Sequence, residues 1–154
     1  VHKEVPEKGM IHIFNRSHYE DVLIQRVHKW IDEKTVIQRF AHINDFESLL
    51  TESGTTILKF YLHISKKRQL ERLQERMSDE TKMWKYNEAD LKERQYWDKY
   101  MNAYSDVFKN CNKVAEWNVV PADENWYKEY LIAGKVVNTL EALKMKFPAL
   151  KPHE

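Results

Sequence analysis

The chain has 154 residues, of which 32% are charged and 42% are hydrophobic, with a formal net charge of +1 at pH 7. These values are typical of one globular domain with a real core, and no apolar run approaches the ~18 residues of a membrane span. The near-zero charge argues against a broad DNA- or RNA-binding surface, and the single cysteine, Cys111, excludes an internal disulfide and indicates a cytoplasmic protein.

The first predicted elements are a strand over residues 10–14, a polar turn, and a helix over about 18–32. Apolar residues recur along this helix with helical spacing: Leu23, Val27, Trp30 and Ile31. In an open α/β sheet, ligands bind where strands end and helices begin, and a helix N-terminus suits phosphate. Arg16 lies at this junction, where its flat guanidinium could bind a phosphate. The alternative is that Arg16 pairs with a carboxylate and holds the turn.

The next helix is predicted to begin at Asn44, because Asn44 and Glu47 form a capping-box pattern. We leave Thr35–Ile43 unassigned and expect Gly54 to end this helix as its C′ residue. A second strand follows over 56–64, nearly continuous in apolar residues, as expected of a strand covered on both faces. Lys59 and His63 interrupt it, and we expect His63 to be a satisfied core residue.

Ser65 is expected to cap a helix over about 66–77 whose one face is strongly cationic. Three arginines share that face at intervals of four residues: Arg68, Arg72 and Arg76. One interpretation is a solvated face that pairs locally with Glu71 and Glu75. The other is a lid, a cationic helix that closes over transferred phosphates.

A polar link over 78–87 holds Trp84 between Lys82 and Lys85, and this Trp could stack on a base or pack into the core. Asn87 is then predicted to cap a long helix. Its aromatic stripe is interpreted as core or subunit contact: Trp97, Tyr100, Met101, Tyr104, Val107 and Phe108. A third strand is predicted over Trp117–Val120, with Asp123 capping a final helix to about residue 146.

The order β-α-α-β-α-α-β-α predicts an α/β fold with a parallel sheet. Because each predicted strand ends in polar residues followed by a helix, we expect three junctions to lie at one edge of the sheet. These are Asn15-Arg16, Ser65 and Asp123.

Four blocks of sequence then carry a family resemblance. In order they are FNRSHYEDVLIQRVH, INDFESLL with GTTILKFYLHISKKRQLERLQER, KMWKYNEADLKERQYWDKYMNAYSDVF, and WNVVPADENWYKEY. Together they resemble the catalytic domain of the type 2 polyphosphate kinases, over residues 1 to about 145. The resemblance implies a P-loop-kinase-like three-layer α/β fold with a helical lid, here as a partial domain. It divides the chain into 1–147, the C-terminal part of the catalytic domain, and 148–154, a tail.

The activity that this resemblance implies is phosphoryl transfer between inorganic polyphosphate and a nucleoside mono- or diphosphate, with Mg²⁺. The chain holds no GxxxxGK[ST] motif, so the resemblance places the Walker A loop upstream and the isolated chain is expected to be inactive. Asn15 and Ser17 match the Walker B block, where an Asp is frequent, so Asn15 would reach Mg²⁺ through water. Arg16 matches its phosphate-binding, catalytic Arg. Glu20 and Asp21 match its acidic pair, or cap the helix.

Other residues receive expected roles from the same resemblance. Arg72 and Arg76 would be catalytic lid residues, with Lys66, Lys67 and Arg68 binding polyphosphate, and the nucleotide-binding candidates are Lys82, Trp84 and Lys85. One departure is Asn110-Cys111-Asn112, where many relatives carry Thr and Ser.

The expected partners are polyphosphate, a nucleotide (ADP/ATP or GDP/GTP, with AMP possible) and a second copy in a homo-oligomer, without membrane, DNA or RNA. Two alternatives stay open: an ATP-dependent nucleotide kinase of similar fold, and a non-catalytic binding or assembly domain.

Overall fold

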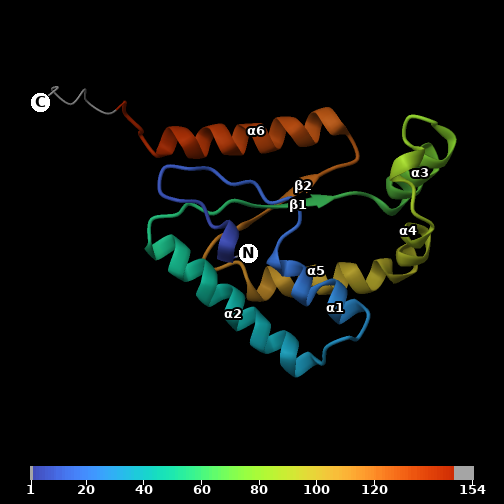
Figure 1. Cartoon of the computed structure of the whole chain (residues 1–154), viewed down its shortest axis with the longest axis horizontal. Helices are drawn as coiled ribbons and strands as arrows, with labels where there is room; N and C mark the ends of the chain where they lie inside the picture. Colours follow the sequence, from blue (N-terminus) through green and yellow to red (C-terminus); the bar gives the residue numbers. More distant parts are fainter. Residues whose placement is uncertain (1, 148–154) are drawn as a thin grey trace, which may run out of the picture.

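The structure, a computed structural model, describes residues 2–147 and has an α/β architecture made mostly of helices (Figure 1). The predicted tail, 148–154, lies outside the described residues. The elements follow in this order: η1 (His2–Glu4), η2 (His18–Val22), α1 (Ile24–Val27), α2 (Glu33–Glu52), β1 (Lys59–His63), α3 (Lys66–Ser78), η3 (Met83–Lys85), α4 (Glu88–Glu93), η4 (Arg94–Tyr96), α5 (Trp97–Asn110), β2 (Trp117–Pro121) and α6 (Asn125–Ala142), with η for a 3₁₀-helix.

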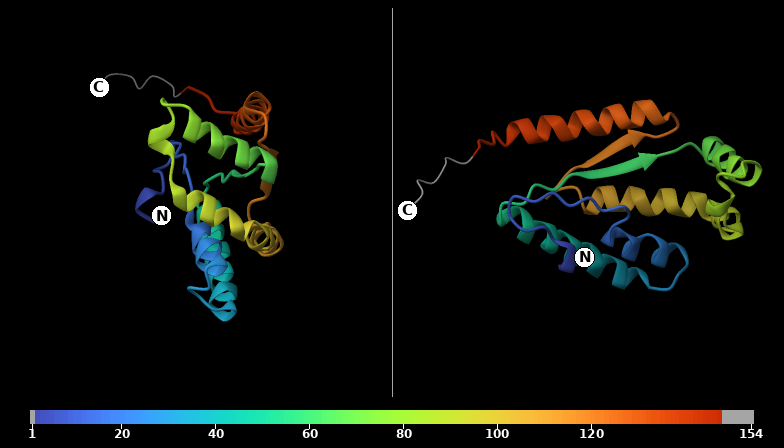
Figure 2. Two further views of the ribbon diagram at one scale, coloured as in Figure 1. Left: turned by 90° about the vertical axis from the view of Figure 1, so that its right-hand side faces the viewer. Right: turned by 45° about the horizontal axis from the view of Figure 1, so that its top comes forward.

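The two described strands, β1 and β2, are parallel neighbours, and their register runs from Lys59 opposite Trp117 to His63 opposite Pro121. The predicted parallel pairing of these strands is therefore confirmed. Helix α6 lies on one side of the pair, and α5 and α2 lie on the other (Figure 2). The strands are less covered than predicted, because Leu62 and Val119 remain exposed. The prediction that His63 is a core residue is wrong, since His63 lies at the exposed end of β1.

The strand predicted over residues 10–14 is not formed within the described part of the chain. An apolar run becomes a strand only when its backbone N–H and C=O groups pair with a neighbouring strand. Within residues 2–147 the sheet has two strands, and this segment pairs with neither of them. The side chains of Met10, Ile11 and Ile13 are accordingly 67%, 73% and 86% exposed.

The helix predicted over 18–32 is much shorter than expected and consists of η2 followed by α1. A 3₁₀-helix has three residues per turn, so Tyr19 and Val22 lie above one another, and both are buried. Lys29 then takes a left-handed backbone conformation, with φ +58°, that a continuing helix does not allow. Trp30 therefore lies outside the helix and is exposed.

Helix α2 covers both the unassigned stretch and the predicted second helix, so the prediction of an N-terminus at Asn44 is wrong. Asp32 is the N-cap, and its carboxylate accepts from the N–H of Thr35 at 2.8 Å. A single face joins the two halves, because the buried residues follow helical spacing: Val36, Phe40, Ile43 and Glu47. The predicted end is confirmed, since Gly54 has φ +90° at the C′ position.

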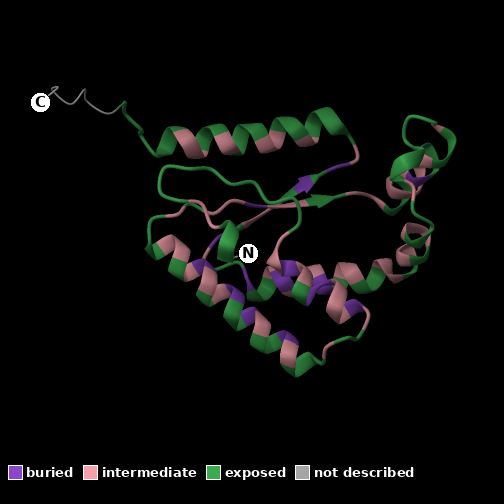
Figure 3. Ribbon diagram, in the orientation of Figure 1, coloured by how far each residue is buried: buried purple, intermediate pink, exposed green. Residues whose placement is uncertain are grey.

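The core lies where α2, α5, α1 and η2 meet, as the buried colouring in Figure 3 shows. Helix α5 contributes Ala103 and Val107 to the core, and four aromatic residues of η4 and α5 pack against it: Tyr96, Tyr100, Tyr104 and Phe108. The core interpretation is confirmed for Tyr100, Tyr104, Val107 and Phe108 of the predicted stripe. The long helix predicted from Asn87 is divided into α4, η4 and α5. Helix α6 has no buried residue in the described part of the chain.

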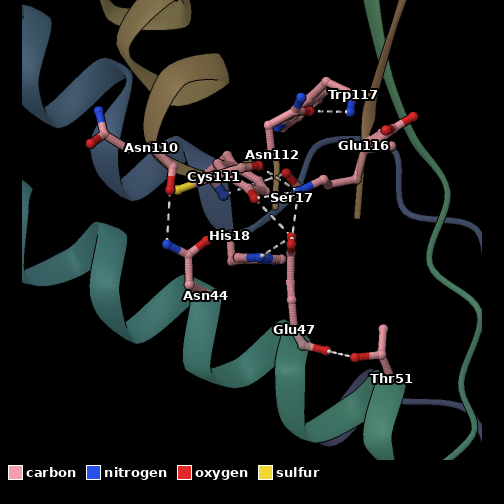
Figure 4. A network of polar contacts seen from close by, with 12 residues as sticks. Ser17, His18, Asn44, Glu47, Thr51, Asn110, Cys111, Asn112, Glu116 and Trp117 are labelled. Carbon is pink, nitrogen blue, oxygen red and sulfur yellow. Dashed lines mark hydrogen bonds and ion pairs between the residues drawn. The ribbon is translucent and has the colours of Figure 1, made fainter. Parts of the chain in front are cut away.

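A polar network sits inside this core. The ammonium of Lys59 donates to Glu47 Oε2 at 2.7 Å, to the Tyr19 hydroxyl at 2.9 Å and to the carbonyl of Cys111 at 2.8 Å. Tyr19 in turn donates to Glu47 Oε1 at 2.7 Å. Figure 4 shows the Glu47 end of the network, with His18 beside the carboxylate. Since Lys59 is 7% and Glu47 1% exposed, β1, α2, η2 and the end of α5 meet at one desolvated ion pair.

We predict that Lys59→Ala lowers the free energy of unfolding by about 3–5 kcal/mol, because it leaves the Glu47 carboxylate buried without its cation. Urea denaturation measures this loss. The matched control is Lys92→Ala, which removes an exposed pair with Glu88 and should cost less than about 1 kcal/mol. Equal losses for the two variants would contradict a special role for the buried pair.

A second prediction concerns the stability of the protein at acidic pH. Burial acts to raise the pKa of Glu47, but the nearby His18 ring and the hydrogen bonds from Lys59 and Tyr19 outweigh it, and the pKa is held below its ordinary value. The stability that Glu47 contributes is therefore complete above its ordinary pKa of about 4.5 and is lost as pH falls through the lowered value. Urea denaturation at a series of acidic pH values should show a shallower acid loss for Glu47→Gln than for the unmodified protein. Glu88→Gln, at an exposed site, should leave the slope unchanged.

Candidate functional site

The site is built at the end of the sheet where β1 runs into α3 and β2 runs into α6 (Figure 1). Ser65 begins α3 as predicted, because its hydroxyl accepts from the N–H of Arg68 at 3.1 Å. The backbone N–H of Ser65 donates to the Asp123 carboxylate at 2.7 Å. The two predicted junctions, Ser65 and Asp123, are thus brought together by the parallel strands.

Asp123 does not cap the final helix, which is a correction to the sequence prediction. The N-cap of α6 is Glu124, and its side chain makes no capping hydrogen bond. The Asp123 carboxylate turns to the start of α3 instead. There the Ser65 N–H, with Arg72 and Arg68 close by, holds the pKa of Asp123 below its usual range, so the carboxylate is ionised at neutral pH.

The three arginines of α3 have different surroundings. Arg68 pairs with Glu71 and Glu75 at 3.0 Å each, as the solvated-face interpretation predicted. Arg76 reaches Asp90 of α4 at 3.4 Å. Arg68 and Arg76 therefore each have a carboxylate partner already. A phosphate that binds either guanidinium must compete with that carboxylate or share the cation with it.

In the described part of the chain, the hydrogen bonds of the Arg72 side chain all go to neutral oxygens. Its Nη2 donates to the carbonyls of Ala122 at 2.9 Å and Asp123 at 3.1 Å, and to Asn125 Oδ1 at 3.0 Å. Among the residues that the structure describes, its Nε and Nη1 have no hydrogen-bond partner. The side chain is thus fixed at Nη2, while the N–H groups of Nε and Nη1 remain available to an anion.

Two lysines in the first turn of α3, Lys66 and Lys67, are exposed. The Lys67 side chain is 89% exposed, with Glu71 at 3.9 Å, and the carbonyl of Lys66 accepts from Arg94 at 3.0 Å. Positive charge therefore surrounds the start of the helix, where the helix dipole also favours an anion.

The Asn15–Ser17 turn precedes η2. Arg16 takes a left-handed backbone conformation with φ +73°, and its side chain is 81% exposed. Its Nε lies 3.9 Å from Glu20, so the turn-holding partner is present but contributes little at such exposure. Ser17 is the N-cap of η2. A shallow hollow adjoins the turn and is lined by Glu4, Phe14, Arg16, Ser17, His18 and Asp21.

The turn and α3 remain separate in the structure. Within residues 2–147, Arg16 makes no hydrogen bond or ion pair with α3. Asn15, the predicted metal residue, is exposed and makes no hydrogen bond to a described residue. No group of three His, Cys, Asp or Glu side chains among the described residues is placed to hold a metal ion, so Asn15 does not by itself fit a Mg²⁺ site.

The nucleotide candidates lie around η3. Trp84 is 78% exposed, so its interpretation as a core residue is wrong. The ammonium of Lys85 lies 4.8 Å from the centre of the Trp84 ring, and Lys82 pairs with Asp79 at 2.7 Å. That contact and those from Thr81 lower the pKa of Asp79 to about 2. An exposed indole flanked by lysines is a surface on which a base could stack.

The sequence analysis missed two residues of this site, Asp123 as the partner of Ser65 and Asn125 as an acceptor for Arg72. A signal was present, because polar residues directly after one parallel strand face those after its neighbour. It also missed the buried network, although Lys59 stood out as a charge inside an apolar strand. No helix in the described part of the chain is long and apolar enough to span a membrane.

The arrangement is an α/β one with a cationic helix where parallel strands end, and such a place suits an anion. The family model for polyphosphate kinase 2 (PPK2) matches residues 1–148. The chain belongs to the polyphosphate kinase 2 family.

Individual relatives agree with this assignment. The chain is 47% identical over 149 residues to an AMP/ADP-polyphosphate phosphotransferase of Meiothermus ruber, covering 96% of this chain and 56% of that protein. It is 37% identical to an ADP-polyphosphate phosphotransferase of Rhodopseudomonas palustris, covering 97% and 56%. The crystal structure of polyphosphate kinase 2 from Arthrobacter aurescens TC1 superposes with a TM-score of 0.96 at 47% identity, covering 99% of this chain and 54% of that one. The chain thus spans about half the length of these relatives.

Proposed function

We propose that the protein carrying this chain transfers a phosphoryl group between inorganic polyphosphate and a nucleoside mono- or diphosphate. The observation that carries the proposal is Arg72, a guanidinium fixed by the β2–α6 turn with the N–H groups of Nε and Nη1 left for an anion. Phosphoryl transfer needs positioning and cationic charge more than covalent chemistry from the protein. The names of the relatives, which are polyphosphate phosphotransferases for AMP or ADP, support the same reaction.

In this proposal α3 acts as a lid. Arg72 and Arg76 meet the oxygens of the transferred group, where negative charge is redistributed in the transition state. The flexible cations of Lys66 and Lys67, with Arg68, hold the polyphosphate chain along the start of the helix. Arg16 binds a further phosphate from the Asn15–Ser17 turn. Because this turn and α3 are separate, Arg16 and the cations of α3 would contact different parts of one substrate.

The nucleotide is proposed to stack its base on Trp84, with Lys82 and Lys85 at its phosphates. A nucleotide base that stacks on Trp84 would cover its exposed indole, and such stacking accepts either purine. The acceptors and products that fit are therefore ADP/ATP or GDP/GTP, with AMP as a further acceptor. The exposure of Trp84 and the nearby ammonium of Lys85 support this assignment.

We further propose that residues 1–147 are the C-terminal part of a P-loop-kinase-like domain with three layers, and that the protein is a homo-oligomer. Support for the layers comes from α6 and α5 lying on opposite sides of the strand pair (Figure 2). Phosphotransferases of this family generally need a divalent metal, and Mg²⁺ is the ion we propose. Because the described residues do not form a site for it, no step above depends on the ion.

The deciding experiment is an assay of the protein with polyphosphate or ATP as phosphoryl donor and AMP, ADP or GDP as acceptor. Transfer from polyphosphate supports the proposal. Transfer from ATP alone favours an ATP-dependent nucleotide kinase, and absence of transfer from both favours a binding or assembly role.

For the lid, we predict that Arg72→Ala and Arg76→Ala each lower kcat on the order of 10²-fold, because each removes a cation aimed at transition-state charge. Rates and thermal melting are measured together, and Lys109→Ala on α5 serves as a control for loss of a surface cation. If all three variants keep the normal rate, α3 is only a solvated face.

For the turn, we predict that Arg16→Lys lowers kcat/KM for polyphosphate by about tenfold or more, since Lys keeps the charge but loses the two-pronged contact. Arg16→Ala should be worse. Glu20→Gln is the matched variant, because it removes the one ion-pair partner of Arg16 in the described part of the chain. A turn-holding role predicts that Glu20→Gln is as damaging as Arg16→Ala, whereas a phosphate role predicts near-normal activity for it.

A further inference from the structure

We propose that Asp123 is a positioning residue for Arg72, and that it acts through the start of α3. The proposal deepens the function proposed above and rests on it. Asp123 makes no contact with Arg72 through its carboxylate. It controls Arg72 by fixing where α3 begins relative to the turn that receives the arginine.

The first step of the argument is the position of the two turns. The carbonyl of His63 accepts from the N–H of Ala122 at 2.8 Å, so the parallel ladder continues to the last residue before Asp123. The β1–α3 and β2–α6 connections therefore leave the sheet side by side. The Asp123 carboxylate crosses this short gap to Ser65 at 2.7 Å and joins two residues that are 58 positions apart.

The second step is that the β2–α6 turn also contacts α3 at a point further along the helix. Arg72 lies two turns of helix after Ser65, and its Nη2 donates to the carbonyls of Ala122 and Asp123. Arg68, one turn before it, reaches the Asp123 carbonyl at 3.4 Å. Asp123 thus accepts from α3 with its side chain at the first turn and with its backbone further along.

The third step is geometric. A helix pinned at one point can swing about that point, whereas a helix pinned at two levels has a defined direction. If the Ser65 contact is lost, the turn holds α3 only through its arginines, and the free Nε and Nη1 groups of Arg72 lose their fixed aim. Binding of a phosphate depends on that aim, because a free N–H group must point at the anion for a hydrogen bond to form.

The test compares Asp123→Ala with Asp123→Asn, whose Oδ1 still accepts from the Ser65 N–H. Isothermal titration calorimetry with polyphosphate and steady-state rates are measured on the same full-length protein. We expect Asp123→Ala to weaken polyphosphate binding and kcat/KM by about tenfold, and Asp123→Asn to restore both to within about threefold of normal.

Asp32→Ala is the matched control, because Asp32 also accepts from a backbone N–H at a helix start, at 2.8 Å from Thr35, but lies on α2 away from α3. It should lower the melting temperature about as much as Asp123→Ala and leave binding and rates normal. If it affects them equally, Asp123 has only a general capping role and the proposal is overturned.

A double-mutant cycle with Arg72→Ala gives the decisive comparison. If Asp123 acts through Arg72, Asp123→Ala should change binding by less than about twofold once Arg72 is absent. The same tenfold loss in both backgrounds would overturn the proposal. A protein that binds polyphosphate with this pattern but transfers no phosphoryl group contradicts the proposed function alone, and one that does not bind polyphosphate contradicts both.

Discussion

The ion pair between Lys59 and Glu47 is the constraint on which the rest of the structure depends. A desolvated lysine is tolerated only when its three donors are satisfied, and here they reach α2, η2 and the end of α5. Because Lys59 is the first residue of β1, the same contacts fix the position of the start of this strand. Burial by the surrounding core, with the charge of Glu47, raises the pKa of Tyr19, so its hydroxyl stays protonated as the donor that the carboxylate requires.

The buried ion pair is also connected to the surface turn that precedes η2. Tyr19 and His18 follow Arg16 and Ser17 directly, and both face Glu47, with His18 Nε2 at 3.8 Å from Oε1. The left-handed backbone of Arg16 is a conformation that non-glycine residues rarely adopt, and it persists only where neighbouring contacts require it. The contacts of Tyr19 and His18 with Glu47 tie the residues that follow this turn to the core.

At the opposite end of β1, the surface is organised by hydrogen bonds to the backbone. Arg72 and Ser65 both contact the turn after β2, and neither contact neutralises the arginine with a carboxylate. A phosphate-binding cation gains from such neutral partners, since they restrict its motion without competing for its charge. Arg68 and Arg76, which do have carboxylate partners, are arranged differently on the same helix face.

The sequence by itself determined the family, the α/β class, the two parallel strands, helix α3 with its Ser65 cap and the C′ position of Gly54. These features depend on the spacing of apolar residues, on capping residues and on continuous motifs. All of these involve residues that are close together in the sequence. Only the tertiary structure decided that Asn44 lies within one long α2, that Asp123 turns to Ser65, and that Lys59 pairs with Glu47. The local capping signal at Asn44 was overruled because one continuous buried face from Val36 to Glu47 packs on the core. The other contacts join residues far apart in the chain, and no local pattern specifies which distant group will satisfy a buried charge.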